Sequence, residues 1–490
     1  MEPAQKRICN GGRNPEKKPP QSPPPPPPLD RLSDLPDCLL VHILNELPIE
    51  NAVATSILSS RWLNLWTLMT KITYPPYHPN FHPFHYYYTT LNHLFSQLVS
   101  PKIDTFHIDF DFHQSYNLLD EGDIATDREY HSFLLPLLEH VCSRNPEMIK
   151  VDFRTYSWKS TNVFNMATCV FNCESLVSLR LYLDFEFDNL SADKLPLINL
   201  PNLKKLCMNL RDLNRVLMGV LFKCLPLLEE LKLVLELIEP DHLINISAPN
   251  LRRLSIKLDE NEEDVLTENC KFVIDAPNLQ TLAIEGILAF YKFVSIPSGL
   301  SDVMISIEES CFNDSQLRTY TRQVMGLLRG IYCAKTIVLD ECGCHLVYCI
   351  YMLEKINLNG FRPPIFHNLC DLSFIIKFEG NRFPSCLLAN LRRLVIEGVE
   401  CYDLEIKLVE YILAHAPVME EIQLSVNPDD SVSGSVIDVD LLAEEYEYCQ
   451  KMFKLPKRSP DCLIDFYGLV IQTSSEDVKE DGELNYTFVE

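Results

Sequence analysis

The spacing of apolar residues changes once along this chain and divides it into a short helical front and a long strand-rich body. Near the front, the following five apolar residues have helical spacing: Leu39, Leu40, Ile43, Leu44 and Leu47. Pro36 suits a first helical turn, and Pro48 ends the helix. Two more short helices are predicted over Glu50–Ser56 and Ser59–Met69, so residues 30–75 are expected to form a small three-helix unit.

The strand-rich body begins near residue 103, where Phe106, Ile108 and Phe110 alternate with polar residues. An L-x-x-L-x-L pattern then recurs, mostly every 21–28 residues. Its nine copies start at Leu176, Leu203, Leu228, Leu251, Leu279, Leu300, Leu369, Leu391 and Met419. This period is typical of leucine-rich repeats, in which each copy supplies one strand and buries its apolar side only by stacking on its neighbours.

The repeats are irregular, and this affects what can be expected of the fold. The asparagine-containing part of the usual consensus is mostly missing, and the stretch 305–365 fits worst, although Ala334 starts a drifted copy. We therefore predict an α/β chain with a degenerate solenoid, not a regular horseshoe. A helix over Leu441–Phe453 and a hydrophobic strand after it are expected to complete the body.

Three segments have a composition that does not favour a packed core. Residues 1–29 are low in complexity and end in six consecutive prolines, so a disordered leader is predicted. Residues 76–102 are expected to be a linker and a helix. The acidic tail, residues 468–490, is expected to be disordered.

The overall charge and the cysteines narrow the classes of partner and compartment. The net charge is −25, which opposes binding to nucleic acid in the absence of a concentrated basic patch. No apolar run approaches the roughly 18 residues that a membrane span needs, and no secretory signal is evident. The 18 cysteines include no CxxC pair. We therefore expect reduced thiols and an intracellular protein of the nucleus and/or cytoplasm, with no contact to membrane or nucleic acid.

Two segments of the sequence carry a family resemblance. LPDCLLVHILNELP at 35–48 and AVATSILSSRWLNLW at 52–66 resemble the F-box, although Cys38 stands where an acidic residue is usual. The segment 390–424 and KLPKRSPDCLIDF at 454–466 resemble the FBD region. The chain is thus similar to the plant F-box/LRR/FBD family, with an F-box at 30–75, a leucine-rich-repeat array at 103–368 and FBD-like repeats at 369–467.

The resemblance implies a role without bond chemistry. Members of this family bind a Skp-family adaptor, and through it a cullin and a RING subunit, while the repeats hold a protein substrate for ubiquitination. The adaptor-binding residues implied here are Leu35, Pro36, Leu39, Ile43, Leu47, Pro48, Ile57, Leu58, Arg61 and Trp62. The alternative is that these residues form only the internal core of the unit, and it applies above all to Trp62 and Trp66. Two other functions stay open: an F-box protein outside a ligase, and a hormone-type small-molecule co-receptor.

The repeats also suggest where a substrate would bind. In each strand, the residues between the buried aliphatics point to the exposed concave side. Basic side chains recur at these positions: Arg180, Lys205, Lys232, Arg253 and, just beyond, Lys257. We hypothesise that they bind an acidic or phosphorylated target, and the alternative is a solvated strand face with no ligand.

No sequence motif indicates an enzyme or a cofactor. Phosphate-binding loops, nucleophile elbows and HExxH helices are missing from the sequence. His78, His82 and His85 are separated by prolines, and the spacing of Cys342, Cys344, His345 and Cys349 is not that of structural zinc sites. We therefore expect no metal, no cofactor and no catalytic residue.

Overall fold

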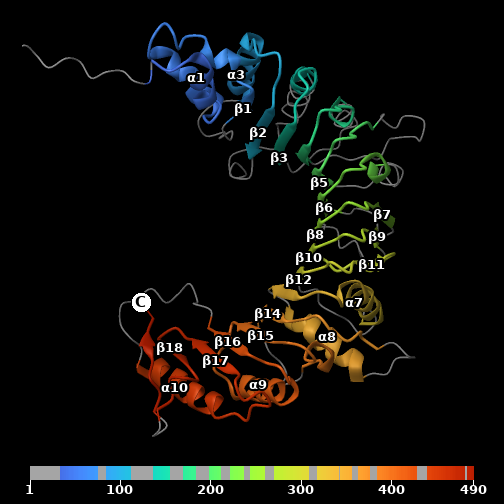
Figure 1. Ribbon diagram of the computed structural model, residues 1–490, viewed down its shortest axis with the longest axis vertical. Coiled ribbons are helices and arrows are strands. Elements are labelled where there is room, and N and C mark those ends of the chain that lie inside the picture. The colour runs from blue at the N-terminus through green and yellow to red at the C-terminus, as the bar shows by residue number, and fades with distance from the viewer. Residues whose placement is uncertain are drawn as a thin grey trace, which may run out of the picture.

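The computed structural model describes most of the chain as one curved body. The described residues are 32, 34–74, 84–111, 136–154, 169–183, 198–210, 221–236, 243–259, 270–307, 317–340, 343–355, 362–375, 383–426, 439–479 and 483–489. Figure 1 shows an arc with the N-terminal helices at one end and the C-terminal strands at the other.

The longer helices lie at the front of the chain and in its second half, and short helical stretches, such as residues 136–142 and 169–171, lie between the early strands. The α-helices are α1 (Asp37–Leu44), α2 (Ile49–Ala54), α3 (Phe84–Gln97), α7 (Leu317–Ile331), α8 (Gly343–Lys355), α9 (Asp403–His415) and α10 (Val439–Phe453). The 3-10 helices are η1 (Thr55–Ile57), η2 (Leu65–Leu68), η5 (Phe222–Cys224) and η7 (Ser385–Leu387).

Strands supply the continuous structure of the body. The long sheet takes them in the order β1 (Lys71–Thr73), β2 (Thr105–Asp111), β3 (Met148–Arg154), β4 (Ser178–Leu183), β5 (Lys205–Leu210), β6 (Glu230–Glu236), β8 (Arg253–Asp259), β10 (Thr281–Gly286), β12 (Asp302–Ile307), β13 (Thr336–Asp340), β14 (Asp371–Ile375), β15 (Arg393–Glu397), β16 (Glu421–Ser425), β17 (Leu463–Tyr467), β18 (Ile471–Ser474) and β19 (Thr487–Phe488). Pairing is parallel up to β17 and antiparallel for β18 and β19. A second, three-stranded sheet has the order β11 (Phe290–Phe293), β9 (Lys271–Asp275) and β7 (Leu243–Ser247).

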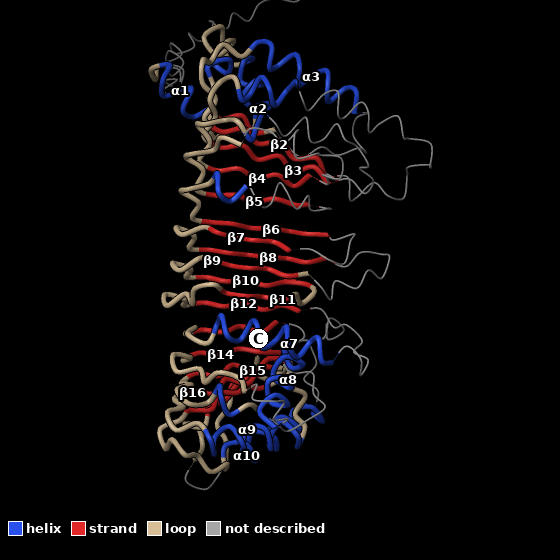
Figure 2. Tube along the Cα trace, turned by 90° about the vertical axis from the view of Figure 1, so that its right-hand side faces the viewer, coloured by secondary structure: helices blue, strands red, loops and turns tan. Residues whose placement is uncertain are grey.

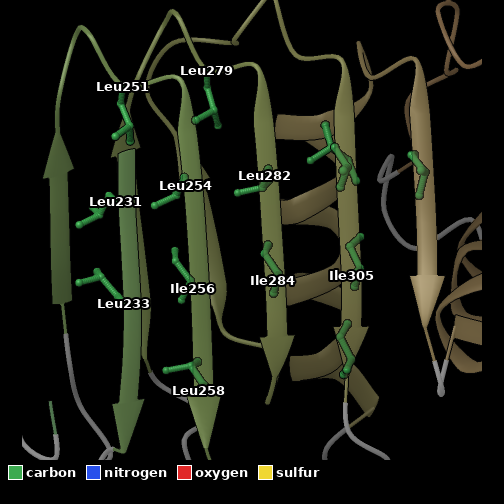
Figure 3. Close-up of a cluster of buried hydrophobic side chains, with 14 of the residues drawn as sticks. Leu231, Leu233, Leu251, Leu254, Ile256, Leu258, Leu279, Leu282, Ile284 and Ile305 are labelled. Atoms are coloured by element: carbon green, nitrogen blue, oxygen red, sulfur yellow. The ribbon is translucent and has the colours of Figure 1, made fainter. Parts of the chain in front are cut away.

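The sheet forms because each strand alternates buried and outward-facing residues. In β8, Leu254, Ile256 and Leu258 are buried, and the residues between them are not. Figure 3 shows the buried aliphatics of neighbouring strands side by side in one layer. All nine predicted L-x-x-L-x-L copies contribute a strand of this sheet, and the drifted copy at Ala334 contributes β13. The predicted α/β class, with a helical front and stacked repeats, is confirmed.

Asparagines link successive turns of the solenoid, which the sequence analysis missed. Each lies directly before the first leucine of a copy, and its side-chain amide donates a hydrogen bond to a backbone carbonyl of the preceding turn. The pairs are Asn202 to Glu174, Asn250 to Pro226, Asn278 to Pro249, Asn368 to Cys333 and Asn390 to His367. They satisfy carbonyl groups at the solenoid edge and fix the stacking of the turns.

The convex side of the arc is built from strands in its middle and from helices towards the C-terminus. In the middle it carries the small sheet of β7, β9 and β11, and towards the C-terminus helices α7 to α10 cover it (Figures 1 and 2). Helix α7 packs directly on β11, and Gly326 allows the close approach, since a Cβ atom there would lie 2.6 Å from the carbonyl oxygen of Tyr291. The three convex strands were not predicted.

The helical front differs from the prediction in its third segment. The α-helix predicted over Ser59–Met69 is wrong, because residues 59–64 form turns and only η2 follows. Ser59, Ser60 and Asn64 favour such turns over a helix. The end of the segment expected to be purely helical also differs, since β1 pairs with β2 in the long sheet.

The C-terminal end is folded where disorder was expected. Residues 471–479 and 483–489 form β18, β19 and a bridge between Val478 and Leu484, so the prediction of a disordered tail from 468 is wrong for this part. The acidic composition suggested disorder, but Leu484 is buried and Glu445, from α10, accepts backbone hydrogen bonds from residues 469–471. The predicted helix over Leu441–Phe453 is confirmed as α10.

Candidate protein-binding surfaces

Helix α1 is apolar on two opposite faces. Leu40 and Leu44, four residues apart, are fully buried and form the core of the helical front with residues such as Trp66. Leu39 and Ile43, also four residues apart, are 47% and 39% exposed. A helix that needed only to pack on its own unit would have one apolar face, so the second face is available to a partner.

The most exposed apolar side chains of the front follow helix α2. Ile57 is 89% exposed and Leu58 is 60% exposed, at the end of η1. Arg61 joins this segment to the start of α1, because its Nη2 atom lies 2.7 Å from Oδ1 of Asp37 and also donates to the carbonyl of Leu35. The two apolar pairs are therefore parts of one compact unit.

The remaining predicted adaptor-binding residues occupy different environments. Pro36 is exposed, whereas Leu35, Leu47 and Pro48 are half-buried. Trp62 is only 2% exposed, so its ring belongs to the core of the unit. The sequence analysis did not select Leu63 and Leu68, which are exposed on the same unit. The sequence carries no clear signal for them, because their exposure depends on the turns and the 3-10 helix that form in place of the helix predicted over Ser59–Met69.

The helical front is joined tightly to the first repeats. The side-chain oxygen of Asn45 accepts hydrogen bonds from the amides of Thr70 and Lys71, at 3.0 and 3.1 Å. The hydroxyl of Tyr74 donates to Glu50 of α2 at 2.8 Å, and the Tyr74 amide donates to His107 of β2. Since Tyr74 is also buried, the front and the sheet share one core.

The concave face of the long sheet presents three rows of outward-facing residues. Strand pairing places Ser178, Lys205, Glu230, Arg253 and Thr281 in the first row. The middle row contains Lys150, Arg180, Cys207, Lys232, Ser255 and Ala283. The third contains Asp152, Tyr182, Asn209, Val234, Lys257 and Glu285. The five predicted basic residues thus share one face but do not form a single ladder.

Ion pairs separate these five cations into two kinds. Glu230 lies between Lys205 and Arg253 in the first row and forms an ion pair with each. Lys257 pairs with Asp259, at 2.6 Å. The guanidinium of Arg180 stacks over the ring of Tyr182, 5.4 Å from its centre. Among the described residues, Arg180 and Lys232 have no ion pair, and these two are the most available for a ligand.

Lys150 and His107 extend the middle row towards the N-terminus, and the sequence analysis missed both. Lys150 is paired in register with His107 on one side and Arg180 on the other. Burial and the charge of Lys150 lower the pKa of His107, Asp152 opposes the shift, and Arg180 adds to it. The MIKVDF segment before the first recognised copy alternates like a strand, and this was the available signal.

Two further findings concern metal binding and membrane spans in the described residues. No group of three or more His, Cys, Asp or Glu within them is placed to hold a metal ion. His78, His82 and Cys342 lie outside the described residues, and the side chains of His85, Cys344 and His345 are not described. In the described part of the chain, no helix has the length and apolar composition needed to cross a bilayer.

Comparison with known families and proteins agrees with this architecture. The F-box domain profile matches residues 32–72, which is the helical front and the start of β1. The FBD profile matches residues 381–424, which span η7, β15, α9 and most of β16, so this region is part of the solenoid and continues its sheet.

Curated relatives match the chain along most of its length. An F-box/FBD/LRR-repeat protein of Arabidopsis thaliana is 25% identical over 81% of this chain and 89% of its own length. F-box/LRR-repeat protein 13 of the same plant is 23% identical over 85% of this chain and 94% of its own. A further F-box/FBD/LRR-repeat protein is 56% identical over 54 residues, 11% of each chain. The chain therefore contains an F-box domain at its front and an FBD within the end of its solenoid, and over most of its length it is similar to F-box/FBD/LRR-repeat proteins of Arabidopsis thaliana.

Proposed function

We propose that this protein is the substrate-recognition subunit of a Skp–cullin–F-box ubiquitin ligase. One observation carries the proposal: the F-box already buries Leu40, Leu44, Trp62 and Trp66 in the core that it shares with the first repeats, and it still exposes four large apolar side chains, Leu39, Ile43, Ile57 and Leu58. F-box domains generally bind Skp-type adaptors. Burying each of these side chains on an adaptor would contribute up to about 1.5–3 kcal/mol before the cost of association.

In this role the protein performs no bond chemistry. The adaptor connects the F-box to a cullin, and the cullin carries a RING subunit with its ubiquitin-conjugating enzyme. The solenoid holds a target protein beside that enzyme and raises the effective concentration of the target's lysines at the ubiquitin thioester. The protein acts in the nucleus or cytoplasm, where free thiols such as Cys270 stay reduced.

The concave face is the surface that we assign to the target. It is lined by outward-facing side chains of the parallel strands, and Arg180 and Lys232 on it carry charge that no described acidic residue neutralises. An acidic or phosphorylated segment would supply the missing partners, because charge-assisted hydrogen bonds are strong and directional. Lys205, Arg253 and Lys257 would contribute in a secondary way, since each already has an acidic neighbour.

The test of this function is co-purification of the full chain with its ligase partners. Wild type is expected to bring down both the Skp-type adaptor and a cullin. Replacing Ile57 and Leu58 with Asp should weaken adaptor binding at least about 100-fold, because about 3 kcal/mol of apolar burial is lost. Val294→Asp is the matched control, since Val294 is 58% exposed and lies at the end of β11, away from the F-box.

Two results would contradict the proposal. Adaptor binding by the Ile57→Asp, Leu58→Asp variant at the wild-type level would remove the assigned docking surface. Capture of the adaptor without any cullin would instead favour an F-box protein that works outside a ligase.

A further inference from the structure

The concave face has opposite charge in its two halves. On this face, the described side chains of strands β3 to β8 include six basic residues against three acidic ones: Lys150, Arg180, Lys205, Lys232, Arg253 and Lys257 against Asp152, Glu230 and Asp259. Strands β12 to β17 present six acidic residues against one basic one: Asp302, Asp340, Asp371, Glu397, Glu421 and Asp465 against Arg393. In a chain with a net charge of −25, the described basic side chains of this face thus gather in the half that lies nearer the F-box.

The two halves do not neutralise each other. The nearest opposite charges of the two halves in one row, Arg253 on β8 and Asp302 on β12, are two strands apart in the sheet order, which is about 10 Å at the usual strand spacing. This exceeds the screening length of about 8 Å at physiological ionic strength. Within the acidic half, Arg393 pairs with Asp371, and no ion pair of the described residues involves Glu421 or Asp465.

The middle row is apolar where the two charged halves meet, although Asp302 and Asp340 lie beside it in the outer rows. The middle row continues from Ala283 to Met304 and Val338, and these last two side chains are 40% and 38% exposed. Side chains in the middle of a sheet face, flanked by a positive and a negative surface, are well placed for the centre of a bound segment.

We propose that the concave face binds an extended segment of the target protein that is acidic at one end, apolar in its middle and basic at the other. The acidic end lies over β3 to β6, and the basic end lies over β14 to β17. This rests on the proposed function, which assigns the concave face to the target, and it defines the chemical class of that target.

The spacing of the strands sets the length of the segment. Arg180 on β4 and Glu397 on β15 are eight strands apart in the sheet order, or about 38 Å. An extended chain covers this distance with about 12 residues, at roughly 3.3 Å per residue. A nucleic acid, or a peptide that is acidic throughout, would be repelled by the half that contains Asp302 and Glu421.

Synthetic peptides can test the charge pattern directly. The probe is a fluorescent 16-residue peptide with four glutamates, an eight-residue apolar centre and four lysines. The comparison peptide has the same composition, but glutamate and lysine alternate at both ends. Fluorescence anisotropy with the full chain, purified with its adaptor, should give at least tenfold tighter binding of the block-charged peptide, and the difference should shrink as salt rises.

Charge-reversal variants identify the part of the concave face that binds the block-charged peptide. Lys150→Glu, Arg180→Glu and Lys232→Glu together should reduce binding of the block-charged peptide at least tenfold. The same reversal of three exposed lysines in the return segments, Lys223 in η5, Lys271 in β9 and Lys292 in β11, should leave binding unchanged. The first variant should also bind a peptide with lysines at both ends more tightly than wild type does, and misfolding cannot produce this gain.

The possible failures can be told apart. Equal binding of the block-charged and alternating peptides overturns this inference, as does equal or tighter binding of a peptide with glutamates at both ends. Retention of the adaptor in the same samples shows that the F-box function is intact. Loss of the adaptor in wild type contradicts the proposed function instead.

Discussion

The side-chain oxygen of Asn45, in the turn after α1, accepts a hydrogen bond from the amide of Lys71 at the start of β1, at a distance of 3.1 Å. The same oxygen accepts a bond from Thr70. One uncharged side chain of the F-box thus satisfies two backbone amides at the first strand of the solenoid. The join between the two parts therefore depends on a specific residue as well as on apolar packing.

Asn45→Ala should destabilise the protein by about 1–3 kcal/mol, because two half-buried amides lose their acceptor. Urea unfolding, followed by tryptophan fluorescence, measures the change close to the join, since Trp62 and Trp66 belong to the same core. Asn51→Ala on the exposed side of α2 is the control and should change stability by less than about 0.5 kcal/mol. Equal effects of the two substitutions would contradict the assigned role of Asn45.

For Gly326→Ala in α7, helix propensity predicts a gain in stability, whereas packing predicts a loss. Glycine to alanine inside a helix usually stabilises by about 0.5–1 kcal/mol. Here a Cβ atom would lie 2.6 Å from the carbonyl oxygen of Tyr291, so Gly326→Ala should lower the melting temperature. Gly299→Ala meets no atom closer than 3.9 Å and serves as the control. A higher melting temperature for Gly326→Ala would show that α7 does not pack on β11 in this way.

Glu445 holds the C-terminal hairpin through its carboxylate. The side chain is fully buried and accepts backbone hydrogen bonds from Leu469, Val470 and Ile471, at 2.6, 3.1 and 3.0 Å. Glu445→Ala should cost at least about 2 kcal/mol, because these amides lose a charged acceptor. Hydrogen exchange should rise first in residues 469–474, and a uniform rise over the whole solenoid would argue against a local role. Glu447→Ala, on the exposed side of α10, is the matched control.

His107 should make stability depend on pH near neutrality. Its lowered pKa means that the folded protein favours the neutral ring. The resulting stability is complete above the ordinary histidine pKa of about 6.5 and is lost as pH falls through that value towards the folded-state pKa. The unfolding free energy of wild type should therefore drop more between pH 7.5 and 5.5 than that of His107→Gln. Parallel curves for the two proteins would contradict this.

Lys150→Gln should raise the pKa of His107, because Lys150 supplies the second-largest of the effects that lower it. Histidine-selective NMR titration measures the shift directly. The analogous change Lys271→Gln, on the convex sheet, should leave the titration of His107 unchanged. An identical pKa in wild type and Lys150→Gln would show that the two side chains are not neighbours in solution.

The repeat pattern predicts most of the concave sheet, because its apolar period is set by simple alternation. The convex strands β7 and β9 were also within reach of the sequence: INISAPNL and FVIDAPNL each alternate before the same Ala-Pro-Asn-Leu turn. The asparagine of that turn was visible too, but its role depends on which carbonyl of the previous turn lies beside it. That neighbour is known only once the turns are stacked.

The candidate surfaces could also be predicted from the sequence only in part. The exposure of Ile57 and the burial of Trp62 depend on how three short segments pack on one another. The spacing of apolar residues along the sequence does not determine that packing. The pairing of Glu230 with Lys205 and Arg253 could have been derived, because aligned copies put all three at the same position. The folded tail could not, since its stability comes from the buried carboxylate of Glu445 on a distant helix.

Because strand pairing is continuous from β1 to β17, the position of a strand in the sheet sets its distance from the F-box. In the proposed assembly, a repeat inserted between β5 and β12 would move the acidic end of the face about 5 Å further from the ligase machinery. An insertion beyond β17 would leave both charged halves where they are. The number of repeats, as well as the side chains they carry, would therefore decide which lysines of a bound target come within reach of ubiquitin.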